Sequence, residues 1–256
     1  MLRLLCREFK EAVGQFPWED EKTVIKGGVA AWRACFPKAR RANICFHKRK
    51  SPIVDADFVH FVGLRRLNMS WCESITDAAF VHLKGIQKLD MESCSQPSIT
   101  DAAFLHLKGI HTLDMRYCSQ PSITDAAFVH LKGIHTLNMI GCNQSTITDA
   151  AFIHLKGIHT LNMAGCRQTT ITDAAFVHLK GIHRLRLYSC TQLTNAVFTH
   201  LKGVKRLNIG FSTQLNLTDD SLKGIEWLCM HFHSQAHIEQ AKSWEYPVDI
   251  ERSYDA

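Results

Sequence analysis

Cysteine and histidine recur at fixed intervals along this chain, and both side chains could do chemistry. Thiolates and imidazoles are zinc ligands, and a cysteine with a histidine can form a nucleophile and its base. The main cysteine column is Cys72, Cys94, Cys118, Cys142, Cys166 and Cys190. The two histidine columns are His82, His106, His130, His154, His178 and His200, and then His111, His135, His159 and His183. We therefore ask first whether these columns form a metal or catalytic site.

The columns themselves favour a structural role. Every cysteine, histidine and aspartate that could join a catalytic triad returns in each copy of a repeat, whereas catalysis needs one unique constellation. The histidine columns have neither an acidic partner nor the short spacing of zinc ligands. The chain has no Gly-rich phosphate loop, GxSxG, HExxH or CxxC. The sequence thus predicts a protein that is not an enzyme and needs no cofactor.

One cluster near the C-terminal end is not repeated. Cys229, His231 and His233 alternate along a predicted strand, with His237 close behind, so their side chains would project to one side. A metal site or a metal-dependent enzyme is one interpretation, and elemental analysis would detect the bound metal. The other interpretation is that these residues cap the last, irregular repeat.

The placement of the cysteines predicts reduced thiols. A buried free cysteine behaves as a small hydrophobic residue with a weak donor. Successive repeats stack about 5 Å apart, so distance alone does not exclude disulfides within the column. A reduced column in a cytoplasmic or nuclear protein fits this arrangement better.

The element that positions these residues is a unit of 24 residues. The unit beginning at Ile123 and the one beginning at Ile147 differ at four of 24 positions. Alternation in residues 86–91 predicts a strand with Leu89 and Met91 inward. Within each unit we expect a short helix with a Thr-Asp start, an inner apolar stripe and a Lys-Gly end. In one copy these are Thr100, Asp101, Ala103, Phe104, Leu107, Lys108 and Gly109.

This unit resembles the leucine-rich repeat, specifically its cysteine-containing subtype. The matching positions are Ile110, Leu113, Met115, Cys118, Ile123, Thr124 and Asp125, and the resemblance extends over residues 46–233. It implies an α/β solenoid, or horseshoe, with a parallel sheet on the concave side and short helices on the convex side. Phe211-Ser212 and His233 interrupt the expected cysteine column.

The chain divides into four predicted parts. Residues 1–28 are a helical segment, 29–52 an N-terminal cap with an atypical first repeat, 53–233 the repeats, and 234–256 a polar C-terminal cap and tail. The atypical repeat follows from aligning ARRANI with LRRLNM, which places Ala39 and Ala42 inward. Trp32 and Phe36 are expected to cover the exposed end of the core.

The N-terminal segment has a second resemblance. Residues 4–13, followed by Phe16-Pro17-Trp18, resemble the C-terminal part of an F-box. F-box proteins with leucine-rich repeats are substrate receptors of cullin-RING ubiquitin ligases, so the resemblance implies an adaptor bound through residues 1–18. The leading Leu-Pro segment and first helices of an F-box are absent from the sequence. A plain amphipathic cap is the alternative.

Charge and hydropathy argue against nucleic-acid binding and against membrane insertion. The formal charge of +6 comes from 30 basic and 24 acidic residues that are interspersed, which does not predict nucleic-acid binding. Arg3 and Arg7 interrupt the first apolar run, and no segment approaches 18 apolar residues. The sequence predicts neither secretion nor membrane insertion, and hence an intracellular protein.

Positions where the repeats disagree are the candidates for function, because the scaffold does not dictate them. On the predicted concave face they are rich in tyrosine, tryptophan and arginine, which dominate binding hot spots. The candidate partner-binding residues are Trp71, Asp90, Glu92, Arg116, Tyr117, Asn138, Asn162, Arg184, Arg186, Tyr188, Arg206 and Phe211. They predict a protein or peptide partner. The alternative is that these are solvated positions that drifted.

Two functional hypotheses follow. The chain is a ubiquitin-ligase substrate receptor that holds its target on the concave face, or it is a free-standing recognition module.

Overall fold

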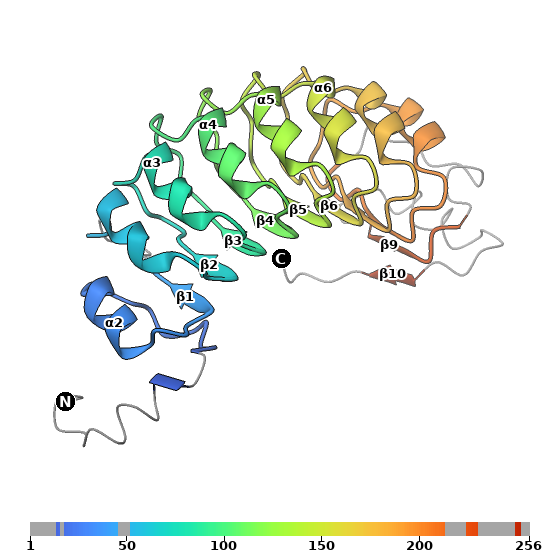
Figure 1. Cartoon of the computed structure of the whole chain (residues 1–256). Coiled ribbons are helices and arrows are strands. Elements are labelled where there is room, and N and C mark those ends of the chain that lie inside the picture. The colour runs from blue at the N-terminus through green and yellow to red at the C-terminus, as the bar shows by residue number, and fades with distance from the viewer. Residues whose placement is uncertain (1–13, 16–17, 46–51, 213–223, 230–248, 252–256) are drawn as a thin grey trace.

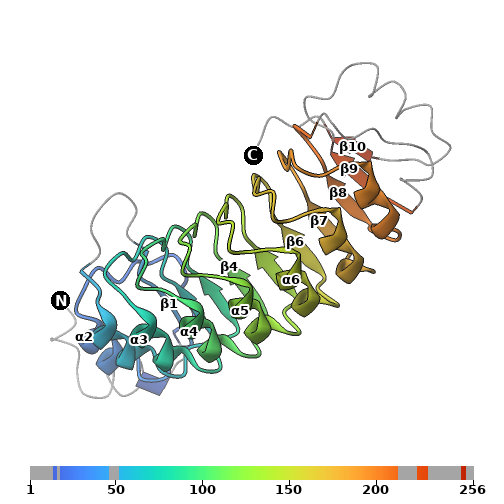
Figure 2. The same ribbon diagram turned by 90° about the horizontal axis from the view of Figure 1, so that it is seen from above.

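The computed structural model describes residues 14–15, 18–45, 52–212, 224–229 and 249–251. In these residues ten strands form one parallel sheet in which neighbours follow chain order. The strands are β1 Arg41–Asn43, β2 Arg66–Asn68, β3 Lys88–Asp90, β4 Thr112–Asp114, β5 Thr136–Asn138, β6 Thr160–Asn162, β7 Arg184–Arg186, β8 Arg206–Asn208, β9 Trp227–Cys229 and β10 Asp249–Glu251. Figure 1 shows an arc with the strands on its inner side and the helices on its outer side, and Figure 2 shows from above how the repeats follow one another in chain order. This is the predicted α/β solenoid.

The convex helices are shorter and tighter than one regular α-helix per repeat. Four repeats have one α-helical turn that continues as a 3-10 turn, and three have 3-10 helix throughout. The helices are α2 Val29–Cys35 in the cap, then η2 Asp55–Phe61, α3 Asp77–Phe80, η3 Val81–Leu83, α4 Asp101–Phe104, η4 Leu105–Leu107, α5 Asp125–Phe128, η5 Val129–Leu131, α6 Asp149–Phe152, η6 Ile153–Leu155, η7 Asp173–Leu179 and η8 Asn195–His200. Helices this short do not propagate, so 3-10 geometry ends the turn.

The predicted start and stop signals of these helices are confirmed. The Thr100 hydroxyl accepts a hydrogen bond from Ala102 N at 3.2 Å, as an N-cap should. Lys108 ends the helical stretch with a ψ of 125°, and Gly109 follows with a φ of 82°. That left-handed conformation is the reason glycine stands there.

The core is a stack of identical layers. Leu89 and Met91 are fully buried, and so are Ala103 and Phe104 on the helix side, with Leu107 at 1% exposure. The predicted inward residues of strand and helix therefore meet, and each repeat buries its apolar face against its neighbours. Strand register is continuous, with Leu89 opposite Leu113 and Leu113 opposite Leu137.

The Thr-Asp pair also joins repeats, a role that sequence reasoning missed. Both oxygens of Asp101 accept hydrogen bonds from Thr124 of the next repeat, from its N–H at 2.8 Å and from its hydroxyl at 2.7 Å. The same two bonds recur from Asp55 to Thr76, Asp77 to Thr100, Asp125 to Thr148, Asp149 to Thr172 and Asp173 to Thr194. The aspartate column thus stabilises the stacking of repeats along the convex side.

The cysteine column is reduced, as predicted, and each thiol points at backbone. None of the described cysteines is in a disulfide, and Cys142 Sγ donates to Met115 O at 3.0 Å. Burial raises the pKa of Cys142 well above its ordinary value, and that of Cys166 to about 12. Ser212 replaces cysteine in this column, as noted from the sequence, but its hydroxyl donates to Leu187 O at 3.0 Å in the same way. Serine supplies the same donor, so the bond pattern continues.

The N-terminal end of the sheet is covered. Ile25 N donates to Asn43 O at 2.8 Å, which pairs residues 18–25 with the edge strand β1. Trp32 and Phe36 pack on the core, as expected, together with Trp18, whose ring centroid lies 4.3 Å from that of Phe36. Such cover protects an open sheet edge.

Two of the four predicted parts, the atypical first repeat and the C-terminal cap and tail, each contribute a strand to the sheet. Ala42 lies opposite Leu67, the register expected from aligning ARRANI with LRRLNM. Strand β10 lies inside the predicted cap and tail and extends the sheet beyond β9. The division itself remains a proposal.

Candidate functional site

Each strand presents a row of side chains to the concave face. The first and third residues of a strand, and the residue two places further on, alternate with buried leucine and methionine. On β7 the row is Arg184, Arg186 and Tyr188. Nine predicted site residues lie in such rows: Asp90, Glu92, Arg116, Asn138, Asn162, Arg184, Arg186, Tyr188 and Arg206.

The other three predicted residues do not lie on the strand face. Trp71, Tyr117 and Phe211 come immediately before the cysteine column or Ser212 and have φ values of 64°, 59° and 54°. Their left-handed backbone turns them onto the bend that follows the strand, where simple alternation no longer applies. Gly141 and Gly165 occupy the same column with φ values of 65° and 68°, and this was the signal in the sequence.

The N-terminal part of the concave face is rich in ion pairs. Arg116 contacts Glu92 at 2.7 Å and Asp114 at 2.9 Å. Asp90 lies opposite Asp114 in the sheet and accepts a hydrogen bond from Ser70 Oγ at 2.8 Å. Burial raises the pKa of Asp114, and the charge of Asp90 raises it further, whereas hydrogen bonds from Arg116 lower it. The polar groups here largely satisfy one another.

The middle of the face is low and neutral. Asn138 Nδ2 donates to Asp114 Oδ2 at 3.0 Å, and Asn162 is only 8% exposed. Neither amide therefore projects as a free contact. The Tyr117 ring lies over Gly141, where an added Cβ would be 2.7 Å from its Cδ1 atom. The side chains of β5 and β6 therefore rise little above the sheet, as the small residues in the sequence predict.

The C-terminal part is basic and aromatic. Arg184 and Arg206 are register partners on β7 and β8, and Arg186 projects from the same face of β7. The Tyr188 and Phe211 rings pack edge to face with centroids 4.9 Å apart. Within the described residues no carboxylate forms a salt bridge with these three arginines. We call Arg184, Arg186, Tyr188, Arg206 and Phe211 the basic-aromatic zone.

A stack of histidines runs beside the rows. The rings of His111, His135, His159 and His183 lie 4.5 Å apart and within 13° of parallel. Desolvation lowers the pKa of His159, and the charges of His135, His183 and Arg184 lower it further. Parallel rings do not converge on one ion, so the stack is a surface feature rather than a metal site.

The predicted C-terminal cluster is only partly placed. Cys229 is buried in β9 at 3% exposure, opposite Asn208, whereas His231, His233 and His237 lie outside the described residues. In the described part of the chain no three metal-ligating side chains come together. None of the described helices is long and apolar enough to cross a membrane.

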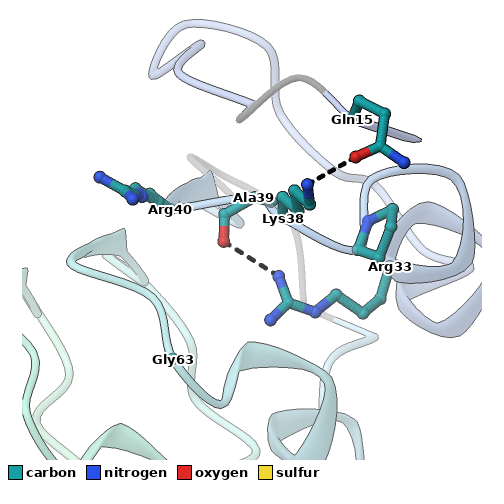
Figure 3. A pocket seen from close by; sticks show the side chains of 7 residues that line it. Gln15, Arg33, Lys38, Ala39, Arg40 and Gly63 are labelled. Atoms are coloured by element: carbon teal, nitrogen blue, oxygen red, sulfur yellow. Dashed lines mark hydrogen bonds between the residues drawn. The ribbon is translucent and has the colours of Figure 1, made fainter. Parts of the chain in front are cut away.

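A separate hollow of about 410 Å³ lies against the N-terminal cap. Its cations are Arg33, Lys38 and Arg40, shown in Figure 3. Lys38 Nζ donates to Gln15 Oε1 at 2.6 Å, and Arg33 Nη1 donates to Ala39 O at 3.0 Å, while Arg40 points away from both. Lys38 and Arg33 bond to residues of the hollow's own wall and Arg40 points away, so the three cations do not converge on one ligand.

Comparisons with known proteins address the fold. No protein-family model and no curated protein matches the chain. Among solved structures, it is similar to a TLR13 complex with the single-stranded RNA ssRNA13 (TM-score 0.59, 18% identity, covering 77% of this chain and 30% of that one). It is also similar to a chain of the Toll–Spatzle complex, a molecular hub in Drosophila development and innate immunity (TM-score 0.55, 16% identity, covering 82% of this chain and 30% of that one).

The glycosylated form of the Toll–Spatzle complex is a third neighbour (TM-score 0.52, 12% identity, 78% of this chain and 34% of that one). The chain thus spans about a third of the length of the structures it resembles. Identities this low speak for the fold alone. Together with the parallel sheet and the stacked repeats, they show that this chain has the leucine-rich repeat fold.

Proposed function

We propose that this protein is a recognition scaffold that binds a protein or peptide on its concave face. The observation that carries the proposal is the basic-aromatic zone on β7 and β8. Its arginines lack carboxylate partners within the described residues, and its two aromatic rings already pack together. Arginine and tyrosine in such a setting are the residues that dominate binding energy.

The cysteines and aspartates of the repeats, which could do chemistry, support this proposal because they hold the repeats together. The thiols donate to backbone carbonyls, and the convex aspartates bind threonines of the next repeat. Groups that hold repeats together are poor candidates for catalysis. One solved neighbour is described in complex with the single-stranded RNA ssRNA13 and another in complex with Spatzle. The interspersed charges of this chain favour a protein partner.

The test compares binding with stability. A displayed library of random 12-residue peptides, selected on the immobilised protein, supplies the probes. Arg186→Ala and Tyr188→Ala should each weaken the selected peptides at least tenfold and leave the melting temperature unchanged. Lys156→Ala, at an exposed position on the convex side, is the control and should alter neither. Equal losses of binding and thermal stability in the concave variants would remove the support for a binding role.

A second proposal concerns a ubiquitin ligase. It rests on the sequence resemblance of residues 4–18 to the end of an F-box and of the repeats to the cysteine-containing subtype. Residues 4–13 lie outside the described residues, and Trp18 packs on Phe36 in the cap. That contact uses Trp18 within the chain and favours the free-standing module. Affinity purification from the native cell decides: recovery of a cullin and its adaptor supports the ligase role, and their reproducible absence rejects it.

A further inference from the structure

Three arginines without a carboxylate partner among the described residues lie together on the concave face. Arg41 pairs with Glu19 and Glu21 at 2.6 and 3.1 Å, Arg66 pairs with Glu21 at 3.0 Å, and Arg116 lies between two carboxylates. Toward the C-terminal end, Lys205 lies next to Arg206 and pairs with Glu226 at 2.8 Å. Arg184, Arg186 and Arg206 have no such partner in the described chain, and Arg186 and Arg206 are exposed.

The acidic residues of the same face do not neutralise this zone. Asp90 and Asp114 lie four and three strands from β7 on one side, and Asp249 and Glu251 of β10 lie three strands from it on the other, while Glu226 beside β8 pairs with Lys205. At about 4.8 Å a strand, the separation is about 14 to 19 Å. The Debye length at physiological ionic strength is about 8 Å, so the arginines keep most of their positive potential. A ligand at β7 therefore meets a local cationic surface.

The row on β7 has a defined spacing. Arg184, Arg186 and Tyr188 follow one another at every second residue on one face. Their side chains start about 6.6 Å apart, which is also the spacing of alternate side chains in any extended peptide. Arg206 stands beside Arg184 on β8, and the Phe211 ring contacts the Tyr188 ring at 4.9 Å between centroids. Two cationic positions are thus followed by one apolar position.

We propose that the basic-aromatic zone binds an extended protein segment whose alternate residues are acidic, acidic and apolar. This inference rests on the proposed function and names its ligand. The two carboxylates pair with Arg184, Arg186 and Arg206, since guanidinium groups bind carboxylates through charge-assisted hydrogen bonds. The apolar side chain packs on Tyr188 and Phe211. The segment lies along β7 and covers two strands of the face.

A polyanion fits this zone less well than a protein segment. Nucleic acid would need positive groups along a longer path. On one side the neighbouring strands β5 and β6 present threonine and asparagine, and beyond them lie Asp114, Asp90 and Glu92. A strand of phosphates continued along the sheet would approach those carboxylates, whereas a short acidic segment ends before them.

The selection described above provides the test. Sequences enriched on the native protein should carry Asp or Glu at alternate positions, with an aromatic or large aliphatic residue two places beyond. A follow-up by fluorescence polarisation compares a selected peptide with an isomer in which the two acidic residues are adjacent. The isomer should bind at least tenfold more weakly. Equal binding of the two isomers would overturn the spacing and the proposal with it.

Variants and competitors separate the remaining outcomes. The combined Arg184→Ala, Arg186→Ala and Arg206→Ala protein should lose the acidic preference, while the corresponding triple lysine variant keeps it at lower affinity and confirms a folded face. Concave-dependent peptides without acidic enrichment would overturn this inference and leave the proposed function standing. If no enriched peptide depends on concave residues, both fail. Tighter binding of a 12-nucleotide oligouridine than of any peptide, or a requirement for phosphorylated peptides, also contradicts it.

Discussion

Both carboxylate oxygens of Asp125 bind Thr148 of the following repeat, one at its backbone N–H and one at its hydroxyl, each at 2.7 Å. The Thr148 hydroxyl also caps its own helix by accepting from Ala150 N at 3.1 Å. One threonine thus connects its own helix start to the neighbouring repeat. This arrangement returns along the convex side, so its loss at one place measures the coupling between repeats.

Asp125→Ala should lower the free energy of unfolding by about 2 to 3 kcal/mol, because it removes a charged acceptor from two hydrogen bonds. Asp125→Asn keeps one acceptor for the N–H and should lose less. Urea unfolding followed by circular dichroism measures both. Glu73→Ala, at an exposed position, is the control and should change stability by less than about 0.5 kcal/mol. An alanine variant as stable as this control would show that the ladder contributes nothing.

Gly141 and Gly165 form a matched pair in the left-handed column. Alanine at either position should cost about 1 to 2 kcal/mol, because both have positive φ. Only at Gly141 would the new Cβ meet the Tyr117 ring, at 2.7 Å; at Gly165 the nearest atom is Gly141 N at 3.9 Å. A crystal structure of Gly141→Ala should show the Tyr117 ring displaced, and Gly165→Ala should leave it in place. An unmoved ring in Gly141→Ala would contradict the contact.

The cysteine column should tolerate serine better than alanine. Cys142→Ser retains a donor toward Met115 O, as Ser212 does toward Leu187 O, whereas Cys142→Ala leaves that carbonyl only the bond from Cys118 N at 3.1 Å. We expect the alanine variant to lose about 1 kcal/mol or more relative to serine. Thermal unfolding under reducing conditions checks the order. If the serine variant were less stable than the alanine variant, the apolar character of this site would matter more for stability than the hydrogen bond.

The same column should resist thiol reagents. Burial raises the pKa of Cys142, so little thiolate forms at neutral pH. Cys35 is only partly buried and should react with a disulfide reagent in the native state. The column should react only as the chain unfolds. Mass spectrometry of labelled peptides distinguishes the positions, and fast labelling of Cys142 in the native protein would contradict its burial.

Asp114→Asn should stabilise the protein near neutral pH. The pKa of Asp114 is raised in the folded state, chiefly by burial, so its charged form is disfavoured there. A raised pKa gives stability that is present below the unfolded value of 3.8 and lost as pH rises through the folded value. Removing the charge therefore raises the free energy of unfolding at a pH above the folded-state pKa of Asp114. It has no such effect at a pH below the unfolded value. Asp101→Asn, on the convex ladder, is the contrasting variant and should lose stability at pH 7.

The fold could be predicted because the repeat shows its period directly in the sequence. Leu89 and Met91 alternate, Thr100 and Gly109 mark the ends of a helix, and each of these signals is local. Each of these signals can be recognised within a single repeat, without reference to the neighbouring one. The residues needed for the arc were therefore identifiable one unit at a time.

Contacts between repeats were harder to infer. The bond from Asp101 to Thr124 joins residues from different units, and nothing within one unit distinguishes it from an ordinary helix start. Trp71, Tyr117 and Phe211 follow the strands instead of lying within them, because a left-handed residue ends strict alternation. Comparing their column with Gly141 would have given the correct backbone. The continuity from Cys190 to Ser212 required knowing that the side chain acts as a donor.

The near-identity of the units beginning at Ile123 and Ile147 makes the length of this molecule adjustable. Deleting residues 123–146 would join Ser122 to Ile147, and the strand, thiol and aspartate contacts would re-form with an almost equivalent neighbour. The arc would shorten by one strand, about 4.8 Å, with both ends unchanged. Gain or loss of a whole unit would thus change the length of the arc and leave the contacts within it almost the same. The number of repeats therefore sets the distance between the cap and the arginines of β7 and β8 without altering either.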